Sequence, residues 1–537
     1  MDREEYDYVI VGAGSAGCVL ANRLSEDPRV RVLVIEAGGS DRSPYIRIPL
    51  AWGQVFARRY FDWGYDTQPN AELNGRVIEC SRGKVIGGSS STNGMAYGRG
   101  HPSDYDGWAA RGLPGWSFAD VLPYFKKSEH WQEGETPLRG GSGPIHTRRQ
   151  GLDDPLVDAW FAAARKLGFP INDDYNGPRQ EGFSVPQYTV RRGMRCSASV
   201  AYLRPALKRR NVSLVTQALA DRILFDGRRA VGIAYRRGGR TAIARARREV
   251  ILAGGVVNSP HLLALSGIGE AAALRKLGIE PLANLPGVGE NLQDHLTVPM
   301  EFERRDTGPF LRNLRWDRFV LMVGQALTRG TGMATGLPMG IKAFLRSSVA
   351  GEGCDMTLLF RVAPGWAAQY PPFVTPPKDG FGYRVLLMKP ESRGFVRTVS
   401  PDPATAPEIH QNFLTAAHDW QVLRDGMRIL RDMTEQPGVA HHVARELAPG
   451  PHVTSDEAID AHIRATAATA HHPTGTCKMA AVDDPAGVVD AELKVRGVDG
   501  LRVVDASIMP EIISGPPNAV VMMIAEKAAD MIRAASR

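Results

Sequence analysis

The sequence predicts an α/β fold that is α+β over the chain as a whole, and three observations support it. First, an apolar run at residues 8–11 is followed by a glycine-rich turn and then by apolar residues at helical spacing. Second, further strand-like runs lie within residues 212–252 and 501–505. Third, the 537 residues are 43% hydrophobic and 23% charged, which is typical of globular proteins. Because one core rarely holds so long a chain, we expect more than one unit.

The first unit, residues 6–39, has the pattern strand, glycine-rich turn, helix, strand and acid. In the turn, Gly12 permits a tight bend, Gly14 lets backbone amides approach a pyrophosphate, and Gly17 allows the helix to pack closely on the strand. The second strand, residues 30–35, ends in Glu36, which is placed to bind an adenosine ribose and would repel a 2′-phosphate. The unit therefore predicts dinucleotide binding but leaves NAD and FAD open.

Other glycine-rich or polar segments follow along the chain. Residues 83–94 form a loop of small residues before a short helix, and such a loop lets the backbone reach a planar ring and a phosphate. Similar segments occupy residues 254–269, 287–295 and 503–510, and a pair of histidines precedes Pro473.

Taken together and in this order, these motifs resemble the glucose–methanol–choline (GMC) oxidoreductase family over essentially the whole chain. Within it, the sequence is most similar to the bacterial choline-dehydrogenase-like alcohol dehydrogenases. The resemblance implies a Rossmann-like FAD-binding domain interleaved with a sheet-plus-helices substrate domain. We expect residues 1–145, 197–298 and 465–537 in the FAD-binding domain, and residues 146–196 and 299–464 in the substrate-binding domain. Residues 366–381 would form either a wall or lid over the pocket or a plain surface connection.

The same resemblance implies FAD-dependent oxidation of an alcohol to an aldehyde or ketone, with the proton passing to His472 and a hydride to flavin N5. His472 directly precedes Pro473, as the catalytic histidine of the family does. Proline favours an extended His472, so we expect His471 and His472 to point to opposite sides of the backbone. Asn518 resembles the second active-site residue of the family, where its amide would donate to the substrate oxygen. It could also cap the terminal helix.

The resemblance further implies which residues bind FAD. They are Gly12, Gly14, Ser15, Ala16, Gly17, Glu36, Ala37, Arg82, Val85, Gly87, Gly88, Ser89, Asn93, Gly94, Met95, Ala96, Ala220, Ala253, Gly254, Asp505, Ala506, Asn518 and Ala519.

The sequence departs from the family pattern at three places. Thr92 stands where some members have a histidine that bonds covalently to the flavin, and a threonine hydroxyl is a poor nucleophile without a base. We therefore expect non-covalent FAD. Val256 replaces the usual alanine of the second signature, and Pro516-Pro517 precedes Asn518 where a polar pair is more usual. The last change could reshape the substrate pocket.

Several alternatives remain open at this point. An oxygen-using alcohol oxidase, a flavin lyase or photoenzyme, and a flavoprotein that only binds or senses would share this fold, although the presence of His472 argues against the last. Oxygen, a quinone or another carrier could accept the electrons. Choline would need an aromatic and acidic cage, and sugars, aryl alcohols and aliphatic alcohols are equally possible substrates.

Composition argues against other classes of protein. The net charge of +7 is small for a chain of 537 residues, and the basic clusters of the sequence contain no interleaved aromatic residues. We therefore expect no nucleic-acid partner. Five scattered cysteines make a poor disulfide framework. The pairs His441-His442 and His471-His472 lack further ligands at metal-binding spacing, and no nucleophile elbow predicts a serine hydrolase. The N-terminus lacks a signal-peptide pattern, and the apolar runs 319–323 and 519–525 are too short to span a bilayer, which favours the cytoplasm.

Overall fold

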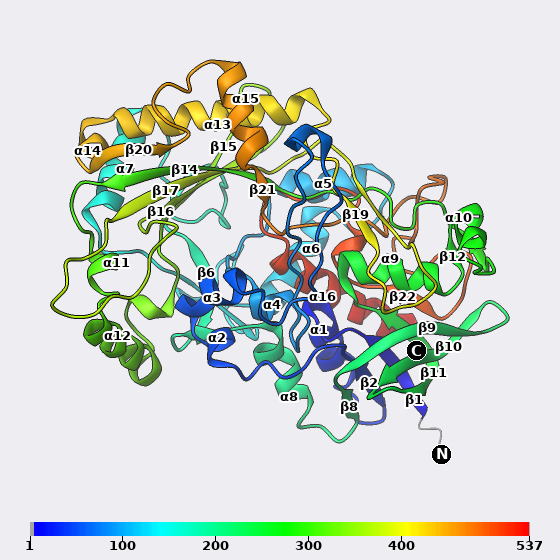
Figure 1. Ribbon diagram of the computed structural model, residues 1–537. Helices are drawn as coiled ribbons and strands as arrows, with labels where there is room; N and C mark the ends of the chain where they lie inside the picture. The colour runs from blue at the N-terminus through cyan, green and yellow to red at the C-terminus, as the bar shows by residue number, and fades with distance from the viewer. Residues whose placement is uncertain (1–4, 536–537) are drawn as a thin grey trace.

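The computed structural model describes residues 5–535, and two seven-stranded sheets dominate it (Figure 1). The first sheet has the order β8-β2-β1-β11-β10-β9, and β22 also pairs with β11. Strands β8, β2, β1, β11 and β22 run parallel, while β10 is antiparallel to both of its neighbours. Its strands are β1 (Glu5–Val11), β2 (Val32–Ile35), β8 (Val212–Val215), β9 (Ala218–Asp226), β10 (Arg229–Arg237), β11 (Arg240–Leu252) and β22 (Leu501–Val503).

The second large sheet is antiparallel, with the order β20-β14-β17-β16-β15-β5 and with β21 paired to β14. Figure 1 shows it at the opposite end of the molecule from the first sheet, beneath a layer of helices. Its strands are β5 (Gly182–Ser184), β14 (Leu296–Arg304), β15 (Met339–Leu345), β16 (Met356–Arg361), β17 (Gly380–Leu387), β20 (Val443–Ala448) and β21 (Ala468–Thr469).

Smaller sheets and the helices complete the fold. Strands β3 (Glu129–Trp131), β4 (Ile145–Arg149), β6 (Gln187–Arg191) and β7 (Met194–Arg195) form one sheet, and two pairs are β12 (Ile268–Gly269) with β13 (Ala283–Asn284) and β18 (Phe395–Arg397) with β19 (Glu408–His410). The α-helices are α1 (Ser15–Leu24), α2 (Pro44–Arg47), α3 (Trp52–Ala57), α4 (Ser89–Thr92), α5 (Pro102–Ala110), α6 (Phe118–Ser128), α7 (Pro155–Lys166), α8 (Arg204–Ala206), α9 (Gly255–Leu265), α10 (Ala271–Lys276), α11 (Pro309–Arg312), α12 (Trp316–Arg329), α13 (Ala417–Glu435), α14 (Pro437–Ala440), α15 (Asp456–Thr466) and α16 (Asn518–Ala535).

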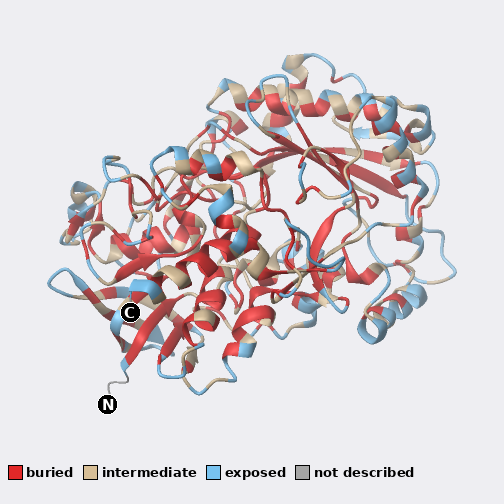
Figure 2. Cartoon of the chain, turned by 180° about the vertical axis from the view of Figure 1, so that it is seen from behind, coloured by how far each residue is buried: buried red, intermediate tan, exposed pale blue. Residues whose placement is uncertain are grey.

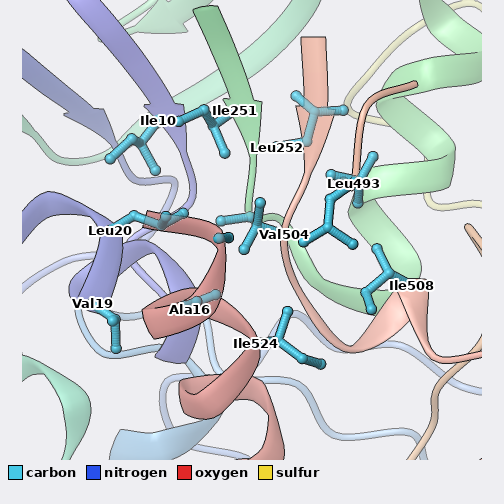
Figure 3. Close-up of a cluster of buried hydrophobic side chains, with 14 of the residues drawn as sticks. Ile10, Ala16, Val19, Leu20, Ile251, Leu252, Leu493, Val504, Ile508 and Ile524 are labelled. Atoms are coloured by element: carbon cyan, nitrogen blue, oxygen red, sulfur yellow. The ribbon is translucent and has the colours of Figure 1, made fainter. Parts of the chain in front are cut away.

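The core of the first half explains why its parallel strands are apolar throughout. Strand β2 is buried at every position, as expected for a strand covered on both faces. Figure 3 shows α1 and α16 packing against the strands, with Leu20 near Ile10 and with Ile524 from the C-terminal helix in the same cluster. Segments from both ends of the chain therefore share one core. Figure 2 colours the buried residues red.

Helices cover one face of the antiparallel sheet, and its other face is turned toward a cavity. Val385 of β17 packs against Gly426 of α13, where an added Cβ would lie 2.4 Å from a Val385 methyl group. Because successive side chains of a strand alternate, Arg384 points to the opposite face. That opposite face lines a large cavity, so the sheet supplies one wall of the candidate site.

The structure confirms the predicted α/β class and adjusts the boundaries of elements. The second strand begins at Val32, two residues later than expected, and the terminal helix spans Asn518–Ala535. The domain division stays a prediction. β14 and β21, which lie beside the expected boundaries near 298 and 465, pair with each other in the antiparallel sheet. All five cysteines are buried and free.

Candidate active site

A cavity of about 780 Å³ lies between the two large sheets, which is within the usual range for ligand clefts. It extends from the glycine-rich turn after β1, past the loop before and after α4, to the histidine pair and the start of α16. Most of the predicted cofactor-binding residues line it. Gly17, Val85, Gly87 and Ala519 do not.

The glycine-rich turn is shaped by close backbone contacts. Gly12 has φ +102°, and a Cβ there would lie 2.4 Å from the carbonyl oxygen of Ala253. A Cβ on Gly17 would lie 1.9 Å from the Gly12 carbonyl, so α1 packs directly on the turn. Gly14 precedes α1 without a side-chain cap. The unpaired amides at the start of this helix therefore suit a pyrophosphate.

Glu36 lies at the end of β2, buried beside this turn. Its Oε2 accepts a hydrogen bond from the Ala13 amide at 2.8 Å and its Oε1 accepts one from the Gly38 amide at 2.7 Å. Burial raises its pKa to about 6 in spite of these bonds. Each carboxylate oxygen keeps a second lone pair for a ribose hydroxyl. The acid can thus hold the turn and bind a ribose at the same time.

The loop at residues 83–96 brings small residues to the middle of the cavity. Gly88 has φ +52° and lies so close to Gly14 that an added Cβ would be 2.8 Å from its Cα. Thr92, the last residue of α4, lines the cavity together with residues 93–96. A flat ring system could therefore reach the backbone here without obstruction.

His472 forms a hydrogen bond with His295 through the Nδ1 atoms of both rings, at 2.9 Å. The Nε2 of His295 lies 3.1 Å from the carbonyl oxygen of Ile513, which can only accept, so this Nε2 carries a proton. Burial lowers the pKa of His295 to about 3, against the effect of the backbone carbonyls of Met388 and Ile513, so the ring is neutral. With its single proton assigned to the Nε2 that faces Ile513, its Nδ1 is an acceptor. His472 therefore donates from Nδ1, and its Nε2 is left as the unprotonated nitrogen.

Asp294 fixes the backbone that carries His472. Its Oδ1 accepts a hydrogen bond from the His472 amide at 2.8 Å, and its Oδ2 accepts from the hydroxyl of Thr469 and from the amide of Gln411. Burial raises the pKa of Asp294 to about 6. Asp294 and His295 lie in the polar segment 287–295, but the sequence alone indicated no role for either residue.

His471 contacts a different set of neighbours from His472. Its ring lies edge-on to Phe56, with centroids 5.0 Å apart, and its Nε2 is 3.8 Å from Glu79. We expected the two histidine side chains to point to opposite sides of an extended backbone. The backbone at His471 is instead in the left-handed region, with φ +62°. Its carbonyl accepts a hydrogen bond from Arg82 at 2.8 Å, which holds this turn.

Asn518 begins α16 and faces the glycine-rich turn. The Ser15 hydroxyl donates to its Oδ1 at 2.7 Å, which leaves the Asn518 amide NH₂ as a donor toward the cavity. The alternative role, an N-cap, would need this oxygen to accept from the helix backbone as well, and no such bond is present among the described residues.

The antiparallel sheet contributes residues that sequence reasoning missed. Lys342, Arg361 and Arg384 line the cavity on the side of the second large sheet. They belong to no sequence motif, and only the pairing of the strands brings them to one wall. Among residues 5–535, no group of histidine, cysteine and acidic side chains is arranged to hold a metal ion, and no helix is long and apolar enough to cross a membrane.

A glycine-rich turn suited to a phosphate at one end of a cavity and a buried histidine at the other fit a flavin-dependent oxidoreductase. Sequence models of the GMC oxidoreductase family match residues 6–297 and 390–525. The chain belongs to this family and is an FAD-dependent enzyme of the alcohol-oxidising class.

Named relatives agree with this assignment. Oxygen-dependent choline dehydrogenases from Rhizobium etli and Brucella anthropi are each 44% identical over 528 residues, covering 98% of this chain and 95% of theirs. Among solved structures, pyridoxine 4-oxidase from Mesorbium loti is 32% identical with a TM-score of 0.87, covering 98% of this chain and 99% of that one. A formate oxidase is 29% identical with a TM-score of 0.89, covering 100% and 99%.

Proposed function

We propose that the protein oxidises an alcohol to an aldehyde or ketone, with His472 as the base that accepts the hydroxyl proton. The observation that carries this role is the pair of hydrogen bonds made by His295. They support the tautomer of His472 whose Nε2 can accept a proton. Bound FAD supplies the acceptor for the two electrons and the carbon-bound hydrogen. His472 and the substrate hydroxyl supply the other half of the reaction.

Asn518 would orient the substrate oxygen. Ser15 occupies the Oδ1 of Asn518, so the amide NH₂ is the group directed to the substrate. Such a donor stabilises negative charge as it develops on the oxygen. The cavity also accounts for the cofactor, because the turn at Gly12–Gly17, Glu36 and the loop at residues 88–96 all line one continuous space.

FAD would be held without a covalent bond. Thr92 occupies the place where some relatives carry an attachment histidine, and the loop from Gly83 to Gly100 contains no histidine. Phosphate contacts at the start of α1, a ribose contact at Glu36 and backbone contacts near Gly88 would share the binding.

Anaerobic reduction of the flavin by alcohols tests the function. Bleaching of the yellow colour by an alcohol, with release of the matching aldehyde or ketone, is the expected result. Flavin that no alcohol reduces would contradict the proposal and favour a lyase or photoenzyme. Admitting air afterwards identifies the acceptor: hydrogen peroxide indicates an oxidase, which the names of several relatives favour.

A further inference from the structure

The cavity wall formed by the antiparallel sheet carries an unusual row of residues. Lys342 of β15 pairs with Leu359 of β16, Leu359 pairs with Arg384 of β17, and Arg384 pairs with Pro299 of β14. Side chains of directly paired residues project from the same face of a sheet. Lys342 and Arg384 therefore point into the cavity from one row, separated by Leu359, and all three line it.

Lys342 is a buried amine without an acidic partner. It is 6% exposed, and its Nζ lies 4.4 Å from the ring centroid of Phe344 and 5.4 Å from that of Tyr175. Within residues 5–535 its side chain makes neither a hydrogen bond nor an ion pair, and burial alone lowers its pKa to about 7. An ammonium group is costly to bury unpaired, so this position is suited to a ligand that brings the missing charge.

Arg384 is in a similar situation. Its side chain has no hydrogen bond or ion pair with any described residue, and burial together with neighbouring Arg361 lowers its pKa. The nearest acid on this wall, Glu301, is already engaged by Arg361 at 2.6 and 2.8 Å. A planar guanidinium with free donors is well matched to an oxyanion.

The remaining acids of the cavity do not neutralise this wall. Glu36 binds backbone amides at the far end, Asp62 is paired with Arg59, and Asp505 accepts from the Gly255 amide and the Ser259 hydroxyl. Glu79 also lines the cavity, 3.8 Å from His471, and its Oε1 has no hydrogen-bond partner among the described residues, but no ion pair joins it to Lys342 or Arg384. A trimethylammonium group, as in choline, would therefore meet two unpaired cations on the sheet wall.

We propose that the alcohol oxidised by this protein carries a carboxylate, which binds Lys342 and Arg384 while its hydroxyl lies at His472. This inference rests on the proposed function for the position of the hydroxyl. Lys342, Arg384 and His472 all line the same cavity, and the charge of Lys342 adds to the lowering of the pKa of His295 and of His472. A bound carboxylate would offset that charge, because it supplies Lys342 and Arg384 with the negatively charged partner that both side chains lack among the described residues.

Ligand binding without turnover is the first test. The holoenzyme is titrated with butyrate, which has no hydroxyl to oxidise, and with tetramethylammonium, and the flavin absorbance is followed. Butyrate should perturb the spectrum, and Lys342→Met should weaken its binding by roughly 10- to 100-fold, the range for one charge-assisted hydrogen bond. Lys342→Arg should restore most of the affinity.

The matched control is Lys378→Met, because Lys378 is an exposed lysine paired with Glu303 outside the cavity. It should leave butyrate binding unchanged. Tighter binding of tetramethylammonium than of butyrate, or equal butyrate affinity in Lys342→Met and the parent, would overturn the proposal.

Turnover is the second test. A series of ω-hydroxy carboxylates of increasing chain length is compared with the methyl ester of each and with choline. The best acid should exceed its ester in kcat/KM by roughly 10-fold or more, mainly through KM, and Lys342→Met should remove that preference. Choline as the best substrate would sink the carboxylate site while leaving alcohol oxidation intact. Butyrate binding through Lys342 with no alcohol oxidised would instead uphold the site and contradict the function.

Discussion

At the scale of single residues, the chemistry depends on which nitrogen of His472 holds a proton. The ring itself cannot decide this, because either tautomer is available to a free imidazole. We assign it through His295: with the single proton of this neutral ring on the Nε2 that faces the Ile513 carbonyl, its Nδ1 accepts from His472. His295 is therefore a positioning residue for the base.

Replacing the two adjacent histidines should have unequal effects. His472→Ala should lower the rate of anaerobic flavin reduction by roughly 10²–10⁴-fold, the usual contribution of a general base. His471→Ala, which removes only the contacts with Phe56 and Glu79, should cost much less. Stopped-flow absorbance measures both, and a larger loss in His471→Ala would reverse the assignment of the base.

The pH dependence of flavin reduction follows from the environment of His472. Burial, with the nearby His295, Lys342, His471 and Arg82, lowers its pKa well below the usual value. The ring therefore stays neutral and able to accept a proton at neutral pH. At saturating substrate the rate should be constant above about pH 6.5, the ordinary histidine pKa, and should fall only on the acid side. A rate that still climbs above pH 8 would mean that another group is the base.

At the scale of elements, the contact between the end of β2 and the turn from β1 to α1 is where we expect the dinucleotide to bind. Glu36→Ala removes a ribose partner and also the acceptor for the Ala13 and Gly38 amides, so FAD affinity should fall by about 10- to 100-fold. Glu36→Gln keeps one acceptor oxygen and should lose less. Equilibrium titration of the apoprotein measures both, and an unchanged affinity in the alanine variant would show that the acid does not contact the cofactor.

The loop around α4 should bind the flavin without a covalent bond. Thr92 is the last residue of this short helix and lines the cavity, and a threonine hydroxyl needs a base to act as a nucleophile. Acid precipitation should therefore leave the yellow colour in the supernatant, with the protein mass unchanged. Flavin in the pellet and a mass increase equal to that of FAD would point to attachment at another residue.

At the scale of the whole molecule, the cavity is walled by both sheets, so a cofactor there links segments that are remote in sequence. Removing FAD should lower the melting temperature, and adding it at about 100 times its Kd should restore about 2.7 kcal/mol of stability. NAD should have little effect, because the ring-binding loop and His472 belong to a flavin site. Differential scanning calorimetry of the apoprotein with each dinucleotide checks this, and stabilisation by NAD alone would contradict the cofactor assignment.

Local sequence was sufficient to predict the dinucleotide unit and the paired histidines. The Gly12 turn, its helix and Glu36 lie within one short stretch, and each is required by nearest-neighbour geometry. Pro473 likewise marked His472 from the adjacent position. The predicted boundaries were less reliable, as at β2, because strand ends depend on pairing partners far along the chain.

The sequence by itself determined the α/β class, the FAD-type turn and the identity of the candidate base. Only the tertiary structure decided the tautomer of His472 and the charge of the substrate wall. His295 lies 177 residues from His472, and Lys342 and Arg384 become neighbours only through the register of β15, β16 and β17. Such contacts arise from the packing of whole sheets, and no local spacing encodes them. The substrate is recognised where distant strands meet, whereas the cofactor turn is built from consecutive residues.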